Sequence, residues 1–251
     1  MAQAEDRGMK IGILQTGRAP EDLHEQHGDY DAMFRRLLAG RGFEFVTYPV
    51  LDGVFPDSVN DAEGWLITGS RFGVYEPHPW IAPLEDFLRR AYAAGVPLVG
   101  ICFGHQILAQ ALGGKVEKFA GGWSVGVERY AVEGLLDDAR LVAWHQDQVV
   151  EKPADAEVIA TSPFCRFAAL AYGDKALSFQ PHPEFTPAFG ADLLKARGKA
   201  LPEELAAKAA ESLEGETSTP AIADMIDAFL RRGQPGKAAA EVEPAAQTVK
   251  P

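Results

Sequence analysis

The amino-acid sequence predicts an α/β fold: a doubly wound, mostly parallel sheet with helices on both faces, followed by C-terminal helices. The first half of the chain indicates this fold because short apolar runs alternate with stretches of helical periodicity, the order in which parallel sheets are built. The composition agrees, since 251 residues with 47% hydrophobic and 24% charged side chains are typical of a globular domain.

The predicted strands and helices of the first half follow one another in turn. Lys10–Thr16, KIGILQT, is a compact apolar run that ends at Gly17, which is typical of a buried strand. Asp29–Ala39 carries apolar side chains at helical spacing and is stopped by Gly40. The same alternation predicts strands at Phe43–Val50, Gly64–Thr68 and Val96–Cys102, and helices at Trp80–Ala94 and His105–Leu112.

The second half has a different pattern, in which strands follow one another with few helices between them. We therefore expect an antiparallel extension or an edge meander of the sheet. These strands are predicted at Val125–Val132, Leu141–Trp144, Glu157–Thr161, Phe167–Tyr172 and Ala176–Phe179, and three helices then follow at Pro187–Arg197, Pro202–Leu213 and Ala221–Arg232.

Residues 9–232 are predicted to form one domain, with a core at 10–198 and a C-terminal helical extension at 199–232. The segment 233–251 is rich in Ala, Pro, Glu and Lys and has little apolar surface to bury. We predict that this segment is a disordered tail, because it cannot offset the entropy that ordering would cost.

Charge and composition exclude several classes of function. The formal net charge of −12 leaves no basic surplus to neutralise phosphates, so we expect no nucleic-acid partner. No stretch approaches the ~20 apolar residues that a membrane helix needs, and Met1–Gly8 is too polar for a signal peptide. Two cysteines are too few for a disulfide framework, so we expect free thiols and a cytoplasmic protein in a reducing compartment. We find no phosphate-binding Gly-Lys-Ser/Thr loop and no metal-ligand cluster, so we expect no cofactor.

The segment Gly100–Gln106, GICFGHQ, carries the strongest chemical signal. An apolar strand runs into Gly-x-Cys-x-Gly and then into a helix, which is the context of a nucleophile elbow. Gly100 and Gly104 provide the small neighbours that the strained turn requires. Cys102 would lie at a helix N-terminus, where the backbone favours a thiolate, and the Phe103 N–H could stabilise an oxyanion. The alternative is a buried, inert cysteine, which is the interpretation we prefer for Cys165.

A thiol nucleophile needs a histidine that is close in space, and His182 is the best placed of the six. It lies in Ser178–Phe185, SFQPHPEF, where prolines end a buried strand at the sheet edge that forms active sites. Glu184 stands two residues later, so an extended backbone puts its carboxylate on the same side as the imidazole. We therefore predict a Cys102–His182–Glu184 triad; the alternative is a loop histidine with a solvated glutamate.

GICFGHQ and QPHPEF together resemble the class I (triad) glutamine amidotransferases. The resemblance is nearest to the amidotransferase domain of GMP synthase and its stand-alone relatives, and it covers about Lys10 to Phe185. It implies a roughly seven-stranded doubly wound domain. It also implies that Cys102 attacks the side-chain amide of glutamine or of a γ-glutamyl compound, forming a thioester that is then hydrolysed.

The resemblance extends to the loop Thr68–Glu76, TGSRFGVYE, which takes the place of the family's glycine loop after the third strand. By that likeness, Gly69 or the Ser70 N–H supplies a second oxyanion donor. The loop departs from the family's Gly-Gly-Pro or Gly-Pro-Gly form, because Ser70-Arg71 replaces the last pair. Arg71 has two interpretations, a contact with a substrate carboxylate or a surface salt bridge.

The resemblance also indicates which residues bind the remote end of the substrate. Gln106 aligns with a glutamine that binds the α-amino acid end in the family. His145–Val149, HQDQV, resembles a His-Gly-Asp-x-Val segment whose backbone meets the α-amino and carboxylate groups. Gln146 and Asp147 are therefore candidates, although Gln146 stands where the family has glycine.

Three functions fit these features. The first is a stand-alone hydrolase or transferase acting on a small-molecule substrate, glutamine or a γ-glutamyl compound. The second is a glutaminase subunit that delivers ammonia to a separate synthase partner, since the chain has no synthase domain of its own. The third is a non-catalytic binding protein that retains the fold. The complete set of Cys102, His182 and Glu184 favours an enzyme.

Overall fold

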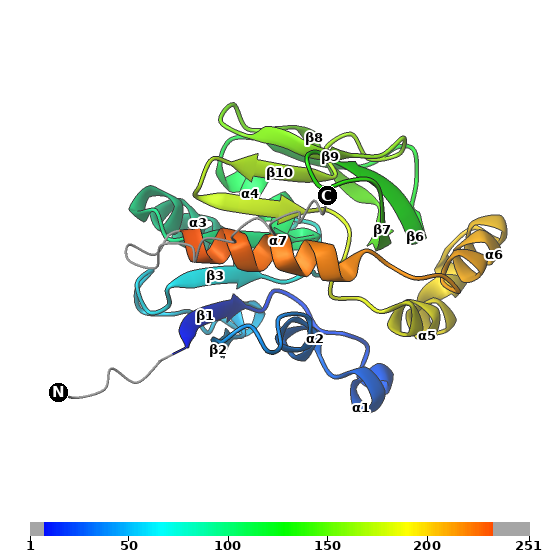
Figure 1. The fold of residues 1–251 in the computed structure, drawn as a ribbon, viewed down its shortest axis with the longest axis horizontal. Helices are drawn as coiled ribbons and strands as arrows, with labels where there is room; N and C mark the ends of the chain where they lie inside the picture. The colour runs from blue at the N-terminus through cyan, green and yellow to red at the C-terminus, as the bar shows by residue number, and fades with distance from the viewer. Residues whose placement is uncertain (1–7, 233–251) are drawn as a thin grey trace, which may run out of the picture.

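The computed structural model describes residues 8–232, and a sheet of nine strands lies at their centre (Figure 1). Five neighbouring strands of this sheet are parallel, and three of them are buried along their whole length, as expected where helices cover both faces. In spatial order the five are β2 (Phe43–Tyr48), β1 (Met9–Leu14), β3 (Gly64–Ile67), β4 (Leu98–Ile101) and β11 (Ala176–Phe179).

The other four strands form the predicted antiparallel extension. They continue the sheet from β11 in the order β10 (Ala169–Tyr172), β9 (Glu157–Thr161), β6 (Ser124–Val132) and β7 (Leu136–His145). The sheet therefore has nine strands in the described part of the chain, where the resemblance implied about seven. The difference arises because β6 and β7 extend the meander as a long antiparallel pair.

A second, two-stranded sheet was not predicted. It pairs β5 (Lys115–Lys118) with β8 (Asp147–Glu151) in antiparallel register. The sequence KVEK buries only Val116, so it has too few apolar positions to indicate a strand. Val116 and Val149 pack in the same cluster as the helix that follows Cys102, so this small sheet covers that helix from outside.

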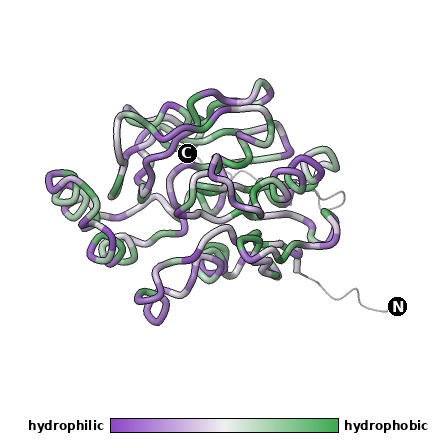
Figure 2. The backbone as a smooth tube through the Cα atoms, turned by 180° about the vertical axis from the view of Figure 1, so that it is seen from behind, coloured by the Kyte–Doolittle hydropathy of each residue, from purple (hydrophilic) through white to green (hydrophobic). Residues whose placement is uncertain are grey.

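Helices cover both faces of the main sheet, as predicted. The helices α3 (Ile81–Ala94) and α4 (Phe103–Ala111) share one hydrophobic cluster, and α2 (Tyr30–Leu37) and α7 (Thr219–Arg232) share another on the opposite face. Figure 1 shows α7 lying across the front of the sheet with α3 and α4 behind it. Figure 2 shows hydrophobic stretches inside and more hydrophilic stretches on the peripheral helices.

A third cluster lies at the edge of the sheet, beside the ends of β6 and β7. It joins Leu23, which precedes the short α1 (His24–His27), to α5 (Pro187–Arg197) and to Leu213, which follows α6 (Glu203–Ser212). Within residues 8–232 there are also three 3₁₀ turns: η1 (Glu21–Leu23), η2 (Val50–Asp52) and η3 (Gly198–Ala200). Ser212 fixes α6 to the sheet, because its Oγ accepts a 2.8 Å hydrogen bond from the Val127 N–H.

The predicted elements agree closely with the structure in the described range. The strands β9 and β11 and the helix α5 have the bounds that the sequence indicated. No helix between residues 8 and 232 is long and apolar enough to cross a membrane. The predicted disordered tail, 233–251, lies outside the described residues.

Candidate active site

Cys102 lies at the turn between β4 and α4 in a strained backbone conformation. Its φ of 54° and ψ of −104° make it the one non-glycine residue with positive φ in the described chain. Such a conformation costs about 1–3 kcal/mol and persists only where the surroundings enforce it. Here the Cys102 N–H donates a 2.8 Å hydrogen bond to the Phe179 carbonyl of β11, which ties the turn to the sheet.

The two glycines of the elbow are required by close backbone packing. A Cβ added to Gly100 would lie 2.6 Å from the carbonyl carbon of Gly104. A Cβ added to Gly104 would lie 2.9 Å from the Cβ of Ile67 in β3. Any side chain at either position would therefore open the turn and displace Cys102, which is the physical reason for the Gly-x-Cys-x-Gly pattern.

His182 and Glu184 meet just beyond the end of β11, as the His-x-Glu spacing predicted. His182 Nδ1 lies 2.7 Å from Glu184 Oε1, and both residues are buried. The His182 N–H donates to the Val142 carbonyl at 2.8 Å, which holds the backbone, while the ring stacks on Phe185 with centroids 3.9 Å apart. The imidazole is thus fixed from three directions, with one nitrogen left for Cys102.

Burial alone would lower the pKa of His182. The Glu184 carboxylate and the adjacent Cys102, with which the ring also hydrogen-bonds, outweigh burial and raise the pKa of His182 to about 10. The imidazole is therefore protonated at neutral pH, with Nδ1 donating to Glu184. The second oxygen of Glu184 is buried and has no hydrogen-bond partner in the described chain, so the carboxylate acts mainly on His182.

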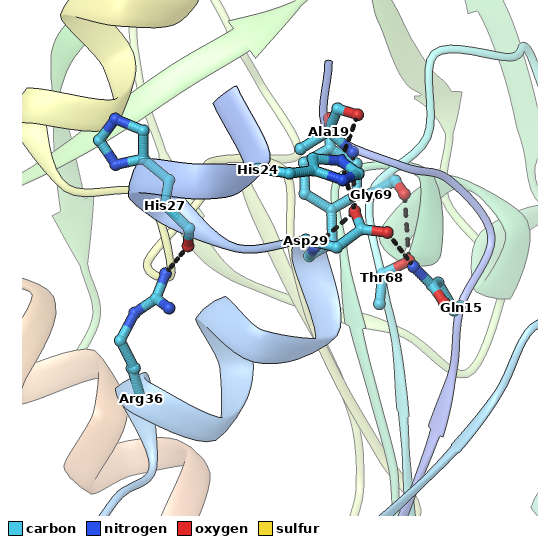
Figure 3. A network of polar contacts seen from close by, with 9 residues as sticks. Gln15, Ala19, His24, His27, Asp29, Arg36, Thr68 and Gly69 are labelled. Atoms are coloured by element: carbon cyan, nitrogen blue, oxygen red, sulfur yellow. Dashed lines mark hydrogen bonds and ion pairs between the residues drawn. The ribbon is translucent and has the colours of Figure 1, made fainter. Parts of the chain in front are cut away.

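The loop after β3 brings Gly69 next to His182 and Cys102. A Cβ at Gly69 would lie 3.0 Å from His182 Cε1 and 3.7 Å from the Cys102 Cβ, so only glycine leaves the space between them open. The hydroxyl of Thr16 holds the loop by donating to the Thr68 carbonyl at 2.9 Å or to the Gly69 carbonyl at 3.2 Å. Figure 3 shows Thr68 and Gly69 within this polar network.

The orientation of that loop bears on the two predicted oxyanion donors. The Gly69 carbonyl faces Thr16, and in a trans peptide the following N–H points the opposite way. The Ser70 N–H is therefore directed away from Thr16. On the other side of Cys102, Phe103 is the first residue of α4, and the leading N–H groups of a helix have no intrahelical acceptor.

Gln106 lies one helical turn after Cys102 and is held by the segment predicted to bind the substrate. Its Nε2 donates to the Asp147 carbonyl at 2.9 Å and to Gln180 Oε1 at 3.1 Å. These two acceptors assign the amide orientation and leave Gln106 Oε1 free to accept a hydrogen bond. Gln180 was not among the predicted residues; its position two before His182 was the available signal, since alternate residues share a side.

Asp147 begins β8 and pairs with the loop after β3. The Tyr75 hydroxyl donates to Asp147 Oδ2 at 2.9 Å. Burial raises the pKa of Asp147 above its ordinary value, although the Tyr75 hydrogen bond and the charge of Lys118 oppose that effect. Gln146 precedes Asp147 with a half-buried side chain, and its carbonyl accepts from the Phe119 N–H at 3.2 Å. No pattern in the sequence indicated a role for Tyr75.

Arg71 does not form the surface salt bridge that was one interpretation of it. Its side chain is exposed, and its guanidinium lies over the Phe72 ring at 5.0 Å from the centroid. Within residues 8–232 it has no ion-pair partner among the described carboxylates. A role toward a substrate carboxylate therefore stays a prediction.

His145, the other histidine near the end of a strand, has a contrasting environment. Its Nδ1 faces the Asp147 carbonyl at 3.2 Å, and its Nε2 is buried without a hydrogen-bond partner in the described chain. Burial and the nearby charge of His182 lower the pKa of His145 to about 3, so it is neutral. No group of three His, Cys, Asp or Glu side chains within residues 8–232 is arranged to hold a metal ion.

An α/β protein with a cysteine on a strand–turn–helix elbow and a histidine–carboxylate pair beside it has the groups that thiol-dependent acyl transfer needs. Comparison with known proteins gives the family. The model of glutamine amidotransferase class-I matches residues 42–197. The chain therefore belongs to the class-I glutamine amidotransferase family, as the motifs indicated.

Two curated relatives and one solved structure illustrate the range of similar proteins. Gamma-glutamyl peptidase 4 of Arabidopsis thaliana is 31% identical over 179 residues, which cover 66% of this chain and 71% of the peptidase. One subunit of the glutamine-hydrolysing GMP synthase of Halobacterium salinarum is 31% identical over 168 residues, covering 64% of this chain and 86% of that subunit. A glutamine amidotransferase from Methylobacillus flagellatus superimposes with a TM-score of 0.70 at 20% identity, covering 94% and 98% of the two chains, and shows the same fold.

Proposed function

We propose that this protein hydrolyses γ-glutamyl amide bonds through a thioester on Cys102. One observation carries the proposal: a cysteine held at a φ of 54° on a nucleophile elbow lies beside a buried histidine that is paired with a glutamate at 2.7 Å. The likeness to a gamma-glutamyl peptidase supports the choice of a γ-glutamyl substrate.

The proposed reaction has two halves. The Cys102 sulfur attacks the γ-carbonyl carbon, and the negative charge that develops on the carbonyl oxygen is stabilised by the Phe103 N–H and by the Gly69 or Ser70 N–H. His182, protonated at neutral pH, gives its proton to the leaving nitrogen, and the C–N bond breaks. A water molecule then attacks the thioester while His182 accepts its proton; the C–S bond breaks and glutamate is released.

Glu184 is proposed to orient His182 and to stabilise its charged form. It lies on the Nδ1 side of the ring, so it holds the tautomer in which the other nitrogen serves Cys102. The proton moves between Cys102, the substrate and His182, and Glu184 keeps its charge throughout.

The remote end of a γ-glutamyl group carries an α-ammonium and an α-carboxylate, and burying either one without a partner is costly. We propose that Asp147 and the free oxygen of Gln106 receive the ammonium group. The Gln146 backbone and Arg71 are proposed for the carboxylate. Because Tyr75 occupies one oxygen of Asp147, the ammonium group would bind the other oxygen or displace Tyr75.

A second candidate function is a glutaminase subunit that supplies ammonia to a synthase. Its support is the likeness to the GMP synthase subunit of Halobacterium salinarum, of which the match covers 86%. Under this alternative the partner would control the rate, so the isolated chain would hydrolyse glutamine slowly and γ-glutamyl peptides hardly at all.

The two candidates can be separated with the purified chain alone. Release of the acid product is measured: glutamate from glutamine and from a γ-glutamyl dipeptide, and glutarate from the matching glutaryl amide, with Cys102→Ala as the blank. We expect the dipeptide to be cleaved and the glutaryl amide, which lacks the α-amino group but keeps the carboxylate, to lose turnover as well as affinity. Slow cleavage of glutamine only, accelerated by cell extract, would replace the proposal with the synthase-subunit alternative. Equal cleavage of the glutaryl amide would contradict the recognition by Gln106 and Asp147.

A further inference from the structure

Tyr75 is an exposed aromatic side chain whose hydroxyl nevertheless has a fixed partner. The residue is 49% exposed, as much as any large hydrophobic side chain in the described chain. Its hydroxyl donates to Asp147 Oδ2 at 2.9 Å, although water could take the place of that acceptor. Tyr75 lies in the loop after β3 and Asp147 begins β8, so this hydrogen bond joins two segments that are 72 residues apart.

Both ends of this hydrogen bond lead back to Cys102. On one side, the Asp147 carbonyl accepts from Gln106 Nε2 at 2.9 Å, and the Gln106 N–H donates to the Cys102 carbonyl at 3.0 Å. On the other side, the loop that carries Tyr75 also carries Gly69, where an added Cβ would lie 3.7 Å from the Cys102 Cβ. The Tyr75–Asp147 pair therefore closes a ring of contacts that begins and ends at the candidate nucleophile.

The loop holds the backbone of Tyr75 in place on both sides. The carbonyl of Val74, which is buried, accepts from Gln110 Nε2 at 2.9 Å and so fixes the loop to α4. The Gly73 N–H donates to Glu76 Oε1 at 2.9 Å, which closes a turn around Tyr75. The hydroxyl therefore starts from a preorganised position, and little further ordering is needed to keep its hydrogen bond.

Gly73 lies directly beside the hydrogen bond between Tyr75 and Asp147. A Cβ added to Gly73 would be 2.8 Å from Tyr75 Cζ and 3.1 Å from Asp147 Oδ2. The tyrosine ring thus packs back onto its own loop, and Oδ2 is occupied from that side. Asp147 Oδ1 has no hydrogen-bond partner within residues 8–232. Because a carboxylate accepts at both oxygens, the arrangement leaves Oδ1 for a ligand.

The same hydrogen bond supports the charge of Asp147. Burial raises the pKa of this half-buried carboxyl, and the charge of Glu76 adds to that effect. The Tyr75 hydroxyl opposes it by donating to the charged form, as does the charge of Lys118. An ionised carboxylate binds an ammonium group through charge-assisted hydrogen bonds, so Tyr75 favours the form of Asp147 that a γ-glutamyl substrate needs.

We propose that Tyr75 is a positioning residue that holds Asp147 for the α-ammonium group of the substrate, and that it thereby makes the enzyme select γ-glutamyl over glutaryl amides. This inference rests on the proposed γ-glutamyl hydrolysis and adds a specificity residue to it. Tyr75 stays bound to Oδ2 while the ammonium group binds Oδ1. Tyr75 touches no reacting atom, so its effect reaches the reaction through Asp147.

The test compares γ-glutamylglycine with N-glutarylglycine, which differs only in lacking the α-amino group. Glycine release is measured from both, and the quantity compared is the ratio of their kcat/KM values. The wild-type ratio should favour γ-glutamylglycine. Tyr75→Phe should lower this ratio about threefold to tenfold, because Asp147 loses the hydrogen bond that orients it. Asp147→Asn should lower it by about 10–100-fold, since the ammonium group loses a charged acceptor.

Two controls separate positioning from a general loss of structure. In the Asp147→Asn background, Tyr75→Phe should change the ratio by less than about twofold, because both substitutions act on the same contact. Tyr92→Phe removes a hydroxyl from α3 and should leave the ratio unchanged. Tyr92 packs on Tyr172, which pairs with Ala176 at the start of β11, the end of that strand opposite to the candidate site.

Three results overturn the inference while γ-glutamyl hydrolysis stands. The first is an unchanged ratio in Tyr75→Phe, including an equal loss for both substrates, which is what a purely structural role gives. The second is a raised ratio, which would mean that Tyr75 competes with the ammonium group. The third is a full threefold to tenfold fall when Tyr75→Phe is added to Asp147→Asn.

Failure of the proposed function gives a different pattern. A wild-type protein that cleaves glutamine but not γ-glutamylglycine overturns the choice of substrate; the same ratio, taken with glutamine and glutaramate, then tests Tyr75 by the same criteria. A wild-type protein that cleaves neither γ-glutamylglycine nor glutamine overturns the proposed function and this inference with it.

Discussion

Cys102 and Cys165 are equally buried, at 5% and 2% exposed, and both side chains belong to one hydrophobic cluster. The two cysteines differ in the charged and backbone groups that lie next to each sulfur. Cys102 stands at the N-terminus of α4 next to a protonated imidazole. Cys165 lies in a loop closed by its own contacts with Ser162, and burial raises the pKa of its thiol to about 12.

The same contrast separates two buried histidines. His182 has a carboxylate on one nitrogen and Cys102 on the other, and its pKa is raised to about 10. His145 has only a carbonyl on one nitrogen, and burial lowers its pKa to about 3. Burial alone lowers the pKa of a histidine, as at His145, and at His182 the charged partners Glu184 and Cys102 reverse that direction. We therefore expect the reactivity of a buried group in this molecule to depend on its partners, and four experiments test that expectation.

The largest expected effect separates the two cysteines. Cys102→Ala should lower kcat for γ-glutamyl hydrolysis on the order of 10⁵-fold, because the covalent step is lost. Cys165→Ala should keep activity within a few-fold and lower the free energy of unfolding by about 1–2 kcal/mol through lost packing. Steady-state kinetics and thermal melts of both variants check this. Comparable losses of activity in two folded variants would remove Cys102 from its assigned role.

Substitutions of His182 and His145 should differ in their effect on kcat nearly as much as those of the two cysteines. His182→Gln removes the proton carrier, so kcat should fall roughly 10³–10⁴-fold. His145→Gln keeps a neutral group that can donate to the Asp147 carbonyl, and we expect less than a tenfold loss. The measurement is kcat with a γ-glutamyl dipeptide, with far-UV circular dichroism as the check on folding. A His182→Gln protein with near-normal turnover would disprove the proposed triad.

The principal elements of this molecule could be predicted from sequence because their signals are local. An apolar run, a helical period and the two glycines around Cys102 each specify a backbone shape without reference to the rest of the chain. The His182–Glu184 contact was predictable for the same reason, since two residues of extended chain place both side chains on one side. The small sheet of β5 and β8 was not predictable, because Val116 is the only buried residue of KVEK.

The contacts that escaped prediction join distant segments. Tyr75 and Asp147 are 72 residues apart, and Gln106 and Gln180 are 74 apart. No pattern within either segment encodes such a pair, since each depends on how α4, β8 and the segments that follow β3 and β11 pack against one another. Tyr30 lies in the segment Asp29–Ala39, which was predicted to be helical, but its position beside Phe185 follows only from tertiary packing.

Alkylation should reveal the difference in reactivity between Cys102 and Cys165 without any substrate. At pH 7.5 iodoacetamide should modify Cys102 at least about 100-fold faster than Cys165, because the thiolate is the reacting species and Cys165, with its pKa of about 12, is almost entirely protonated. Peptide mapping by mass spectrometry over time gives both rates in one sample. Denatured protein is the control, in which the rates should converge. Equal rates in the folded protein would contradict the contrast between the two cysteines.

The smallest expected effect concerns Glu184, the carboxylate that raises the pKa of His182. The pKa of His182 is raised from its ordinary 6.5 to about 10, so its charged form, and the stability it contributes, is fully present below pH 6.5 and is lost as the pH rises through about 10. Glu184→Gln removes the attraction of a full charge while keeping an oxygen that can accept from Nδ1. Activity should therefore fall by about 10–100-fold, less than in His182→Gln, and the alkaline limb of kcat/KM should move to lower pH.

The pH profile distinguishes this role from a purely structural one, because a variant that only loosened packing would lower activity at every pH and leave the limb in place. Glu128→Gln is the matched control, since Glu128 is a partly buried carboxyl on β6 to which no role in the candidate site is assigned. A shift of the limb in the Glu128 variant, or none in the Glu184 variant, would show that the charge beside His182 does not control its protonation.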